Sequence, residues 1–141
     1  PGVFDYADLS SVGANTVFRL FGSASFAAPY IRDQYAGAAA LGADLLNRFA
    51  NQRQYVTVSL ADSADGSLSG KFVTDHAYTV WSLVTVGGQV TAVILRNPWG
   101  TDSGNAGVSY ADANPADGLV QMTLAELYSS RGRLNWGTRV P

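Results

Sequence analysis

Apolar residues recur at helical spacing through the first third of the chain. Residues 15–21 predict a short helical turn that ends at Gly22, where a residue without Cβ can adopt a left-handed cap. Pro29 suits the first turn of a longer helix, and Gly37 and Gly42 weaken the prediction of one unbroken rod. The apolar positions that predict this helix are Tyr30, Ile31, Tyr35, Ala38, Leu41, Leu45, Leu46 and Phe49.

The period of the pattern changes from residue 54 onward. Residues 54–60 alternate and are rich in β-branched side chains, which predicts a strand. Residues 61–71 are polar and contain glycine, as expected of a loop. Two further strand-like runs, 76–86 and 89–96, are separated by Gly87-Gly88, the pair expected in a tight primed turn. These two runs therefore predict an antiparallel hairpin.

The last third of the chain returns to mixed patterns. Residues 100–117 are rich in Gly, Asp, Asn and Ser and are expected to form a long surface loop. An extended pattern resumes over 118–122, and Thr123 with Glu126 forms a capping box for a short helix. Residues 133–140 predict a final strand. Helices followed by mainly antiparallel strands indicate an α+β fold.

Composition limits the class of protein. With 47% hydrophobic and 14% charged residues, residues 1–141 are expected to form a single soluble domain, without the roughly 18-residue apolar run that a membrane span needs. The net charge of −2 and the absence of a basic cluster argue against nucleic-acid binding. No signal peptide is visible, which favours an intracellular protein over a secreted one, although a fragment would look the same.

The hairpin register predicts one candidate site. If Gly87-Gly88 forms the turn, Tyr78 opposes Asn97 and His76 opposes Trp99, so that His76, Asn97 and Trp99 share one face. Because Pro98 cannot donate a ladder hydrogen bond, regular pairing should stop near it. An amide oxygen that accepts from one imidazole nitrogen leaves the other to serve a thiol.

From pairing geometry alone, a structural interpretation of the same residues is favoured over a catalytic one. A single histidine in a strand is usually a half-buried polar residue, and Asn-Pro usually marks a turn. Tyr78 and Trp81 alternate within the strand and are therefore expected to belong to the core rather than to contact a substrate.

Two segments carry a resemblance to a known family. DHAYTVWSL followed by AVILRNPWG resembles the calpain signature, in which a Gly-His-Ala-Tyr strand precedes an Arg-Asn-Pro-Trp-Gly strand end. Papain-type proteases normally have Asn-Ser-Trp-Gly at the later motif, so Pro98 matches the calpain version better. The resemblance implies a twisted antiparallel β-sheet with flanking helices, the second lobe of a papain-like calpain protease core.

The resemblance also implies residue roles. His76 would be the general base, Asn97 its orienting partner, and Trp99 the indole that shields the pair. In papain-like enzymes the cysteine lies about 130 to 150 residues before the histidine, whereas His76 has 75 residues before it and the chain contains no cysteine. The nucleophile is therefore expected in an upstream lobe absent from this chain, and the chain alone should be inactive.

Two departures from the family pattern are visible. Asp75 stands where the family usually has glycine. Calpain lobes also bind calcium, and Asp117 matches one family ligand, but Leu119 stands where an acidic ligand is typical. The remaining oxygen ligands near this loop are few and widely spaced for a cation that prefers six to eight, namely Asp102, Ser103 and Asp112.

Three functional hypotheses follow from the sequence. In the first, the domain belongs to a cysteine endopeptidase that hydrolyses peptide or protein substrates. In the second, it is a non-catalytic pseudoprotease or protein-interaction domain with the same fold. In the third, it is a processed fragment that docks the other lobe through an apolar face. His76 and Asn97 together favour the first hypothesis.

Overall fold

The computed structural model describes residues 29–102, 114 and 116–137. The short helical turn predicted over residues 15–21 and the last three residues of the predicted 133–140 strand lie outside this part of the chain. The helical elements are α2 (Ile31–Gln34), α3 (Ala38–Leu46), the π-helical turn η2 (Asn47–Asn51) and α4 (Leu124–Ser129). The strands are β1 (Tyr55–Leu60), β2 (His76–Val86), β3 (Gln89–Arg96), β4 (Leu119–Thr123) and β5 (Arg133–Gly137).

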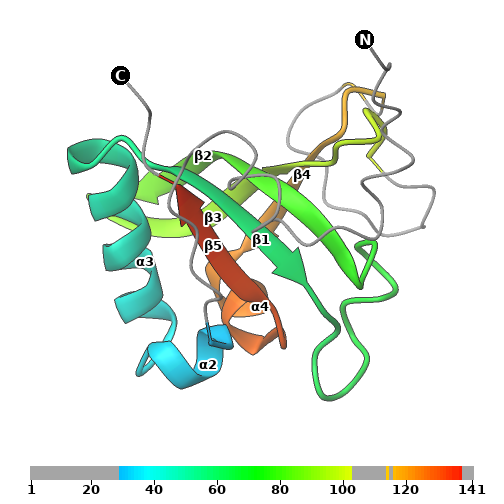
Figure 1. Cartoon of the computed structure of the whole chain (residues 1–141), viewed down its shortest axis with the longest axis horizontal. Helices are drawn as coiled ribbons and strands as arrows, with labels where there is room; N and C mark the ends of the chain where they lie inside the picture. The colour runs from blue at the N-terminus through cyan, green and yellow to red at the C-terminus, as the bar shows by residue number, and fades with distance from the viewer. Residues whose placement is uncertain (1–28, 103–113, 115, 138–141) are drawn as a thin grey trace, which may run out of the picture.

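The five strands form one sheet in the order β4-β3-β2-β1-β5, and every pairing in it is antiparallel. Figure 1 shows a twisted sheet with α2, α3 and α4 gathered along one side of it. The α+β architecture predicted from the sequence is therefore confirmed. β2 begins and β3 ends toward the right-hand side of Figure 1, and this edge carries the candidate site.

The core lies between the helices and one face of the sheet. β1 shows the alternation that a half-buried strand requires: Val56, Val58 and Leu60 are buried, whereas Tyr55 is exposed. From the helices, Ile31, Leu41 and Leu45 complete the apolar layer. Tyr78 on β2 belongs to the same cluster, as predicted.

The helix predicted from Pro29 to Phe49 is broken near Gly37, one of the two glycines that weaken the prediction of one unbroken rod. α2 ends at Gln34, because Tyr35 adopts an extended conformation, and α3 starts only after Gly37. Gly42 lies inside α3 without breaking it. A Cβ at this position would stand 2.7 Å from the Leu124 side chain. This glycine allows α3 to approach α4 closely.

The β2–β3 hairpin is confirmed, with a more complex register than the sequence predicts. Gly87 and Gly88 have φ values of 58° and 78°, as a primed turn requires. Val86 pairs with Gln89, and irregularities between Val80 and Ser82 and between Val84 and Thr85 shift the middle of the ladder. The two shifts cancel, because Thr79 pairs with Arg96 and so restores the predicted register at the far end.

Trp81 does not belong to the core, and the prediction for this residue is wrong. Its side chain is 54% exposed, and the Arg96 guanidinium stacks 5.0 Å from the ring centroid. Strand alternation accounts for this exposure: Tyr78 and Val80 point into the core, so Thr79 and Trp81 point to the opposite, exposed face.

Residues 119–129 also follow the predicted pattern of a strand and a capped helix. β4 resumes at Leu119, and Thr123 caps α4 through a complete capping box with Glu126. Throughout the described ranges, each helix is too short or too polar to reach across a lipid bilayer.

Candidate active site

His76 opens β2 at the edge of the sheet. It pairs with Leu60, the last residue of β1, and its ring is partly buried. The preceding residue, Asp75, has a φ of 54°, in the left-handed region that glycine enters most easily. The turn into β2 therefore has a glycine-like conformation, which aspartate tolerates better than most residues.

Asn97 follows the last residue of β3 and is fully buried. Its backbone has left the β2 ladder: its N–H donates to Gly118 O at 2.7 Å, and its carbonyl accepts from Gly100 N at 3.1 Å. Regular pairing with β2 ends at Arg96, as Pro98 predicts. The Asn97 side chain is consequently free to turn toward His76.

The two side chains meet in a hydrogen bond. His76 Nε2 lies 3.0 Å from Asn97 Oδ1. The Asn97 amide orientation follows from its other contacts, since Nδ2 donates to Thr101 O at 2.9 Å and Trp99 N donates to Oδ1 at 3.0 Å. Oδ1 is therefore an acceptor, and His76 Nε2 must carry the proton. In the neutral imidazole Nδ1 is then the basic nitrogen.

Two aromatic rings flank the imidazole. The Trp99 ring centroid lies 4.3 Å away with a 42° tilt, and the Tyr78 centroid lies 5.0 Å away at 86°. Trp99 itself is 60% exposed, so it covers the imidazole from the solvent side. The structure thus brings together His76, Asn97 and Trp99, the three residues that the sequence places on one face.

Gly118 is a further residue of the site that the sequence analysis did not single out. It has a φ of 79°, and a Cβ at this position would lie 2.8 Å from Asn97 O and 3.2 Å from Gly100 Cα. β4 can therefore approach the Asn97 turn this closely only with glycine. The Asp-Gly pair at 117–118 signals a turn, but the close contact depends on tertiary packing.

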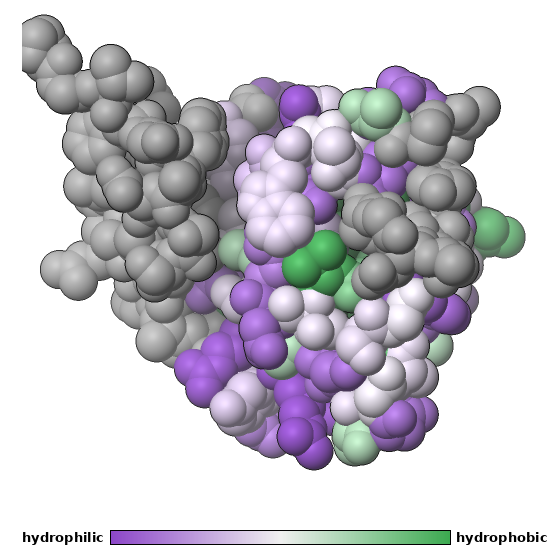
Figure 2. All heavy atoms as spheres, turned by 90° about the vertical axis from the view of Figure 1, so that its right-hand side faces the viewer, coloured by the Kyte–Doolittle hydropathy of each residue, from purple (hydrophilic) through white to green (hydrophobic). Residues whose placement is uncertain are grey.

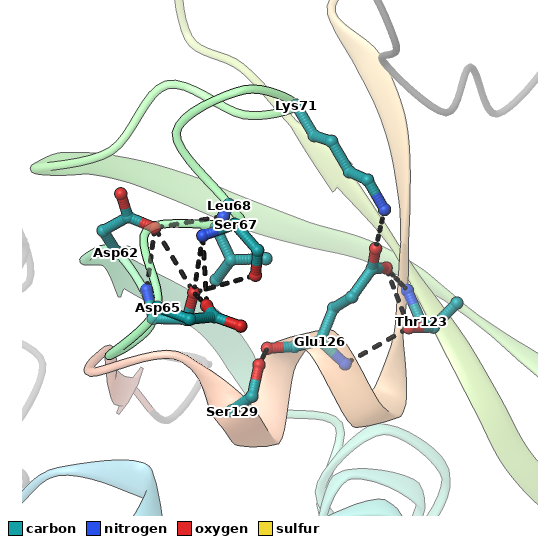
Figure 3. Close-up of polar contacts among 9 residues, drawn as sticks. Asp62, Asp65, Ser67, Leu68, Lys71, Thr123, Glu126 and Ser129 are labelled. Atoms are coloured by element: carbon teal, nitrogen blue, oxygen red, sulfur yellow. Dashed lines mark hydrogen bonds and ion pairs between the residues drawn. The ribbon is translucent and has the colours of Figure 1, made fainter.

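The loop between β1 and β2 is tied down on the way to His76. Figure 3 shows the Asp62 and Asp65 carboxylates turned into the loop and Lys71 reaching Glu126 on α4. Asp62 Oδ1 accepts from Ser63 N, Leu68 N and Ser69 N. Hydrogen bonds from Ser63 and Ser67 hold the pKa of the Asp65 carboxyl at about 2. The segment that leads into His76 thus has a defined path.

The calcium site implied by the family resemblance finds little support in the described residues. Asp117 Oδ1 accepts from Leu119 N at 2.8 Å, which is a turn contact. Asp102 is buried, while Ser103 and Asp112 lie outside the described part of the chain. Over residues 29–102, 114 and 116–137, no three acidic, histidine or cysteine side chains gather to hold a metal ion. Within the described residues, the calcium site therefore stays a prediction of the family resemblance.

An open groove of about 470 Å³ lies elsewhere, between the segment that joins η2 to β1 and residues 79–81 of β2. Its lining includes neither His76 nor Asn97; the residues that line it are Phe49, Arg53, Gln54, Tyr55, Thr79, Val80 and Trp81. Figure 2 views the molecule from the right-hand side of Figure 1, and the described part of that face is mostly hydrophilic or neutral with small hydrophobic areas. We see no broad apolar patch on this described face.

The site contains an oriented base and a support for it. Burial of Asn97 protects the hydrogen bond that fixes the imidazole, so Nδ1 can accept a proton from a nearby acid. The chain itself contains no thiol to supply that proton. In comparisons with known proteins, no protein-family model matches the chain, and no curated protein gives a significant match.

Proposed function

We propose that this domain is the histidine- and asparagine-bearing lobe of a calpain-like cysteine endopeptidase. The observation that carries the proposal is the hydrogen bond between His76 Nε2 and Asn97 Oδ1, in which two further contacts fix the amide orientation. The motif resemblance and the calpain-type Asn97-Pro98-Trp99 strand end support the same function. The nucleophilic cysteine would come from an upstream lobe.

Under this proposal each group has one step. His76 Nδ1 takes the proton of the cysteine thiol, and the thiolate attacks the carbonyl carbon of the scissile peptide bond. As the C–N bond breaks, the imidazolium returns its proton to the leaving amine. Nδ1 then activates a water molecule, which hydrolyses the acyl-enzyme and regenerates the thiol. Asn97 holds the imidazole in the required tautomer throughout.

A peptidase assay of the full-length protein tests this function. We expect His76→Ala to lower kcat/KM by about a thousandfold or more, because the base is lost. Asn97→Ala should lower it by roughly ten- to a hundredfold, because the base remains but is poorly oriented. Asn135→Ala is the matched control, since Asn135 is also a buried asparagine but donates to Ser59 Oγ on β1.

The results of this assay distinguish the protease from the non-catalytic domain. Normal hydrolysis by His76→Ala would make the assignment of the base wrong. An upstream lobe without a cysteine, or full-length protein without peptidase activity, would favour the non-catalytic interaction domain with the same fold. A loss of activity equal in Asn97→Ala and Asn135→Ala would indicate general destabilisation.

A further inference from the structure

Tyr78 has contacts that core packing alone does not require. It lies two residues after His76 on β2, so both side chains point to the same face of the sheet. Its side chain is 2% exposed and packs with the buried apolar residues. A phenylalanine could fill the same volume. The phenol oxygen and the orientation of the ring therefore need a separate explanation.

The ring of Tyr78 limits where the imidazole can turn. The two rings meet almost perpendicularly, with centroids 5.0 Å apart and planes at 86°. Edge-to-face contacts of this kind are favourable and directional. Trp99 lies on the imidazole at 4.3 Å, and Asn97 binds Nε2. The histidine ring is thus held by an amide, an indole and a phenol ring.

The hydroxyl of Tyr78 fixes the chain that leads into His76. Its oxygen accepts a hydrogen bond from Val73 N at 3.0 Å. Two residues before Val73, Lys71 pairs with Glu126 on α4 at 2.7 Å. Two residues after it, Asp75 adopts the left-handed conformation that turns the chain into β2. The phenol therefore connects the end of this loop to the imidazole through one side chain.

We propose that Tyr78 is a positioning residue for the catalytic base: its ring restricts rotation of the His76 imidazole, and its hydroxyl fixes the segment from Val73 to Asp75. Together these contacts keep Nε2 on Asn97 and Nδ1 directed away from it. This inference rests on the proposed function for its catalytic consequence, but the restraint on the imidazole can be measured without activity. Burial raises the pKa of the Tyr78 phenol, so the hydroxyl stays protonated near neutral pH.

The first test is NMR of the imidazole in the 141-residue chain. His76 is the only histidine, so every imidazole signal comes from it, and couplings to the ring C–H protons distinguish Nδ1 from Nε2. In the unmodified chain we expect the neutral ring as the Nε2–H tautomer with slow exchange of that proton. Tyr78→Phe should speed this exchange by about three- to tenfold, and Tyr78→Leu by more, because the ring contact is also lost.

Tyr128→Phe is the matched control for this test. Tyr128 OH donates to Tyr35 O at 3.2 Å, so the variant also removes one tyrosine hydroxyl bond, but away from His76. The inference is supported if only the Tyr78 variants change the ring nitrogen shifts and proton exchange. It is overturned if Tyr78→Phe and Tyr78→Leu, both folded by circular dichroism, leave the imidazole signals as they are in Tyr128→Phe.

The second test is peptide hydrolysis by the full-length protein. Tyr78→Phe should lower kcat by about three- to tenfold and leave KM within about twofold, because a misoriented base slows chemistry without removing substrate contacts. Unchanged kcat together with altered NMR signals would overturn the catalytic part of the inference. If the unmodified enzyme has no peptidase activity, the proposed function fails while the NMR test still decides whether Tyr78 restrains His76.

Discussion

His76, the first residue of β2, and Asn97, the residue directly after β3, are joined by their side chains, with Nε2 and Oδ1 3.0 Å apart, beyond the point where β2 and β3 stop pairing. The β2–β3 ladder ends at Arg96, whereas the Asn97 N–H donates to Gly118 O and so continues the pairing on the β4 side by one residue. Gly118, directly before β4, therefore holds the backbone from which the Asn97 amide reaches the imidazole. The stability of this arrangement should depend on Gly118 as much as on the two residues that form the bond.

Substitution of Gly118 by alanine tests this dependence. The new Cβ would stand 2.8 Å from Asn97 O at a φ of 79°, so both the clash and the backbone conformation oppose it. We expect Gly118→Ala to lower the free energy of unfolding by about 2–4 kcal/mol. Urea denaturation measures this change, and NMR of His76 reports whether the hydrogen bond is displaced.

Gly70→Ala is the control for this prediction. A Cβ at Gly70 would meet no atom within 4 Å. Its unfolding free energy should change by less than about 0.5 kcal/mol. Equal stability of the two variants would mean that the close approach of β4 to Asn97 does not hold in solution.

The sequence correctly predicts that His76 and Asn97 share a face, but the regular hairpin register behind this prediction holds only at the two ends of the ladder. Counting back from Gly87-Gly88 assumes a regular ladder, whereas the ladder contains two irregularities whose shifts cancel before Thr79. Had only one been present, the count would have failed by one residue and placed the two side chains on opposite faces.

Other parts of the fold depend on contacts that a linear pattern does not contain. The apolar spacing is helical on both sides of Gly37, so the break between α2 and α3 cannot be read from periodicity. The orientation of the Asn97 amide depends on Thr101 O, and that of its backbone on Gly118 O. The capping box at Thr123 was predictable because all of its bonds lie within four residues.

Asp75 provides a second prediction, on backbone strain beside the base. Its φ of 54° is costly for most side chains and easy for glycine. We expect Asp75→Gly to change stability by less than about 1 kcal/mol, since relief of strain is offset by the greater freedom of glycine in the unfolded chain. Asp75→Val should cost about 1–2 kcal/mol. Urea denaturation of both variants compares them, and equal costs would argue against the left-handed conformation.

The Asp65 carboxyl predicts acid sensitivity of the loop before His76. Hydrogen bonds from Ser63 and Ser67 lower its pKa from 3.8 to about 2. Because the folded pKa is lower than the usual value, this contribution to stability is complete above pH 3.8 and is lost as the pH falls toward 2. Asp65→Ala should therefore reduce the pH dependence of stability in that window.

The measurement is urea denaturation at several pH values between neutrality and pH 2. Asp33→Ala serves as the control, because Asp33 is an exposed aspartate on α2, away from the loop. We expect it to retain the slope of the unmodified chain. A slope that is the same in Asp65→Ala and Asp33→Ala would contradict the role of the Asp65 hydrogen bonds.

Glu126 takes part in both the capping box of α4 and an ion pair with Lys71, so two variants can compare what the cap and the ion pair contribute to stability. Thr123 accepts from Glu126 N at 3.2 Å, while the Glu126 carboxylate binds Thr123 N at 2.9 Å and Lys71 Nζ at 2.7 Å. Thr123→Ala should cost about 1 kcal/mol, as loss of an N-cap usually does. Glu126→Gln should cost less, about 0.5 kcal/mol, because glutamine preserves the box and the lost pair with Lys71 is partly exposed. Thermal and urea denaturation compare the unfolding free energies of the two variants. A larger cost for Glu126→Gln than for Thr123→Ala would show that the ion pair with Lys71, rather than the helix cap, ties the loop that precedes His76 to α4.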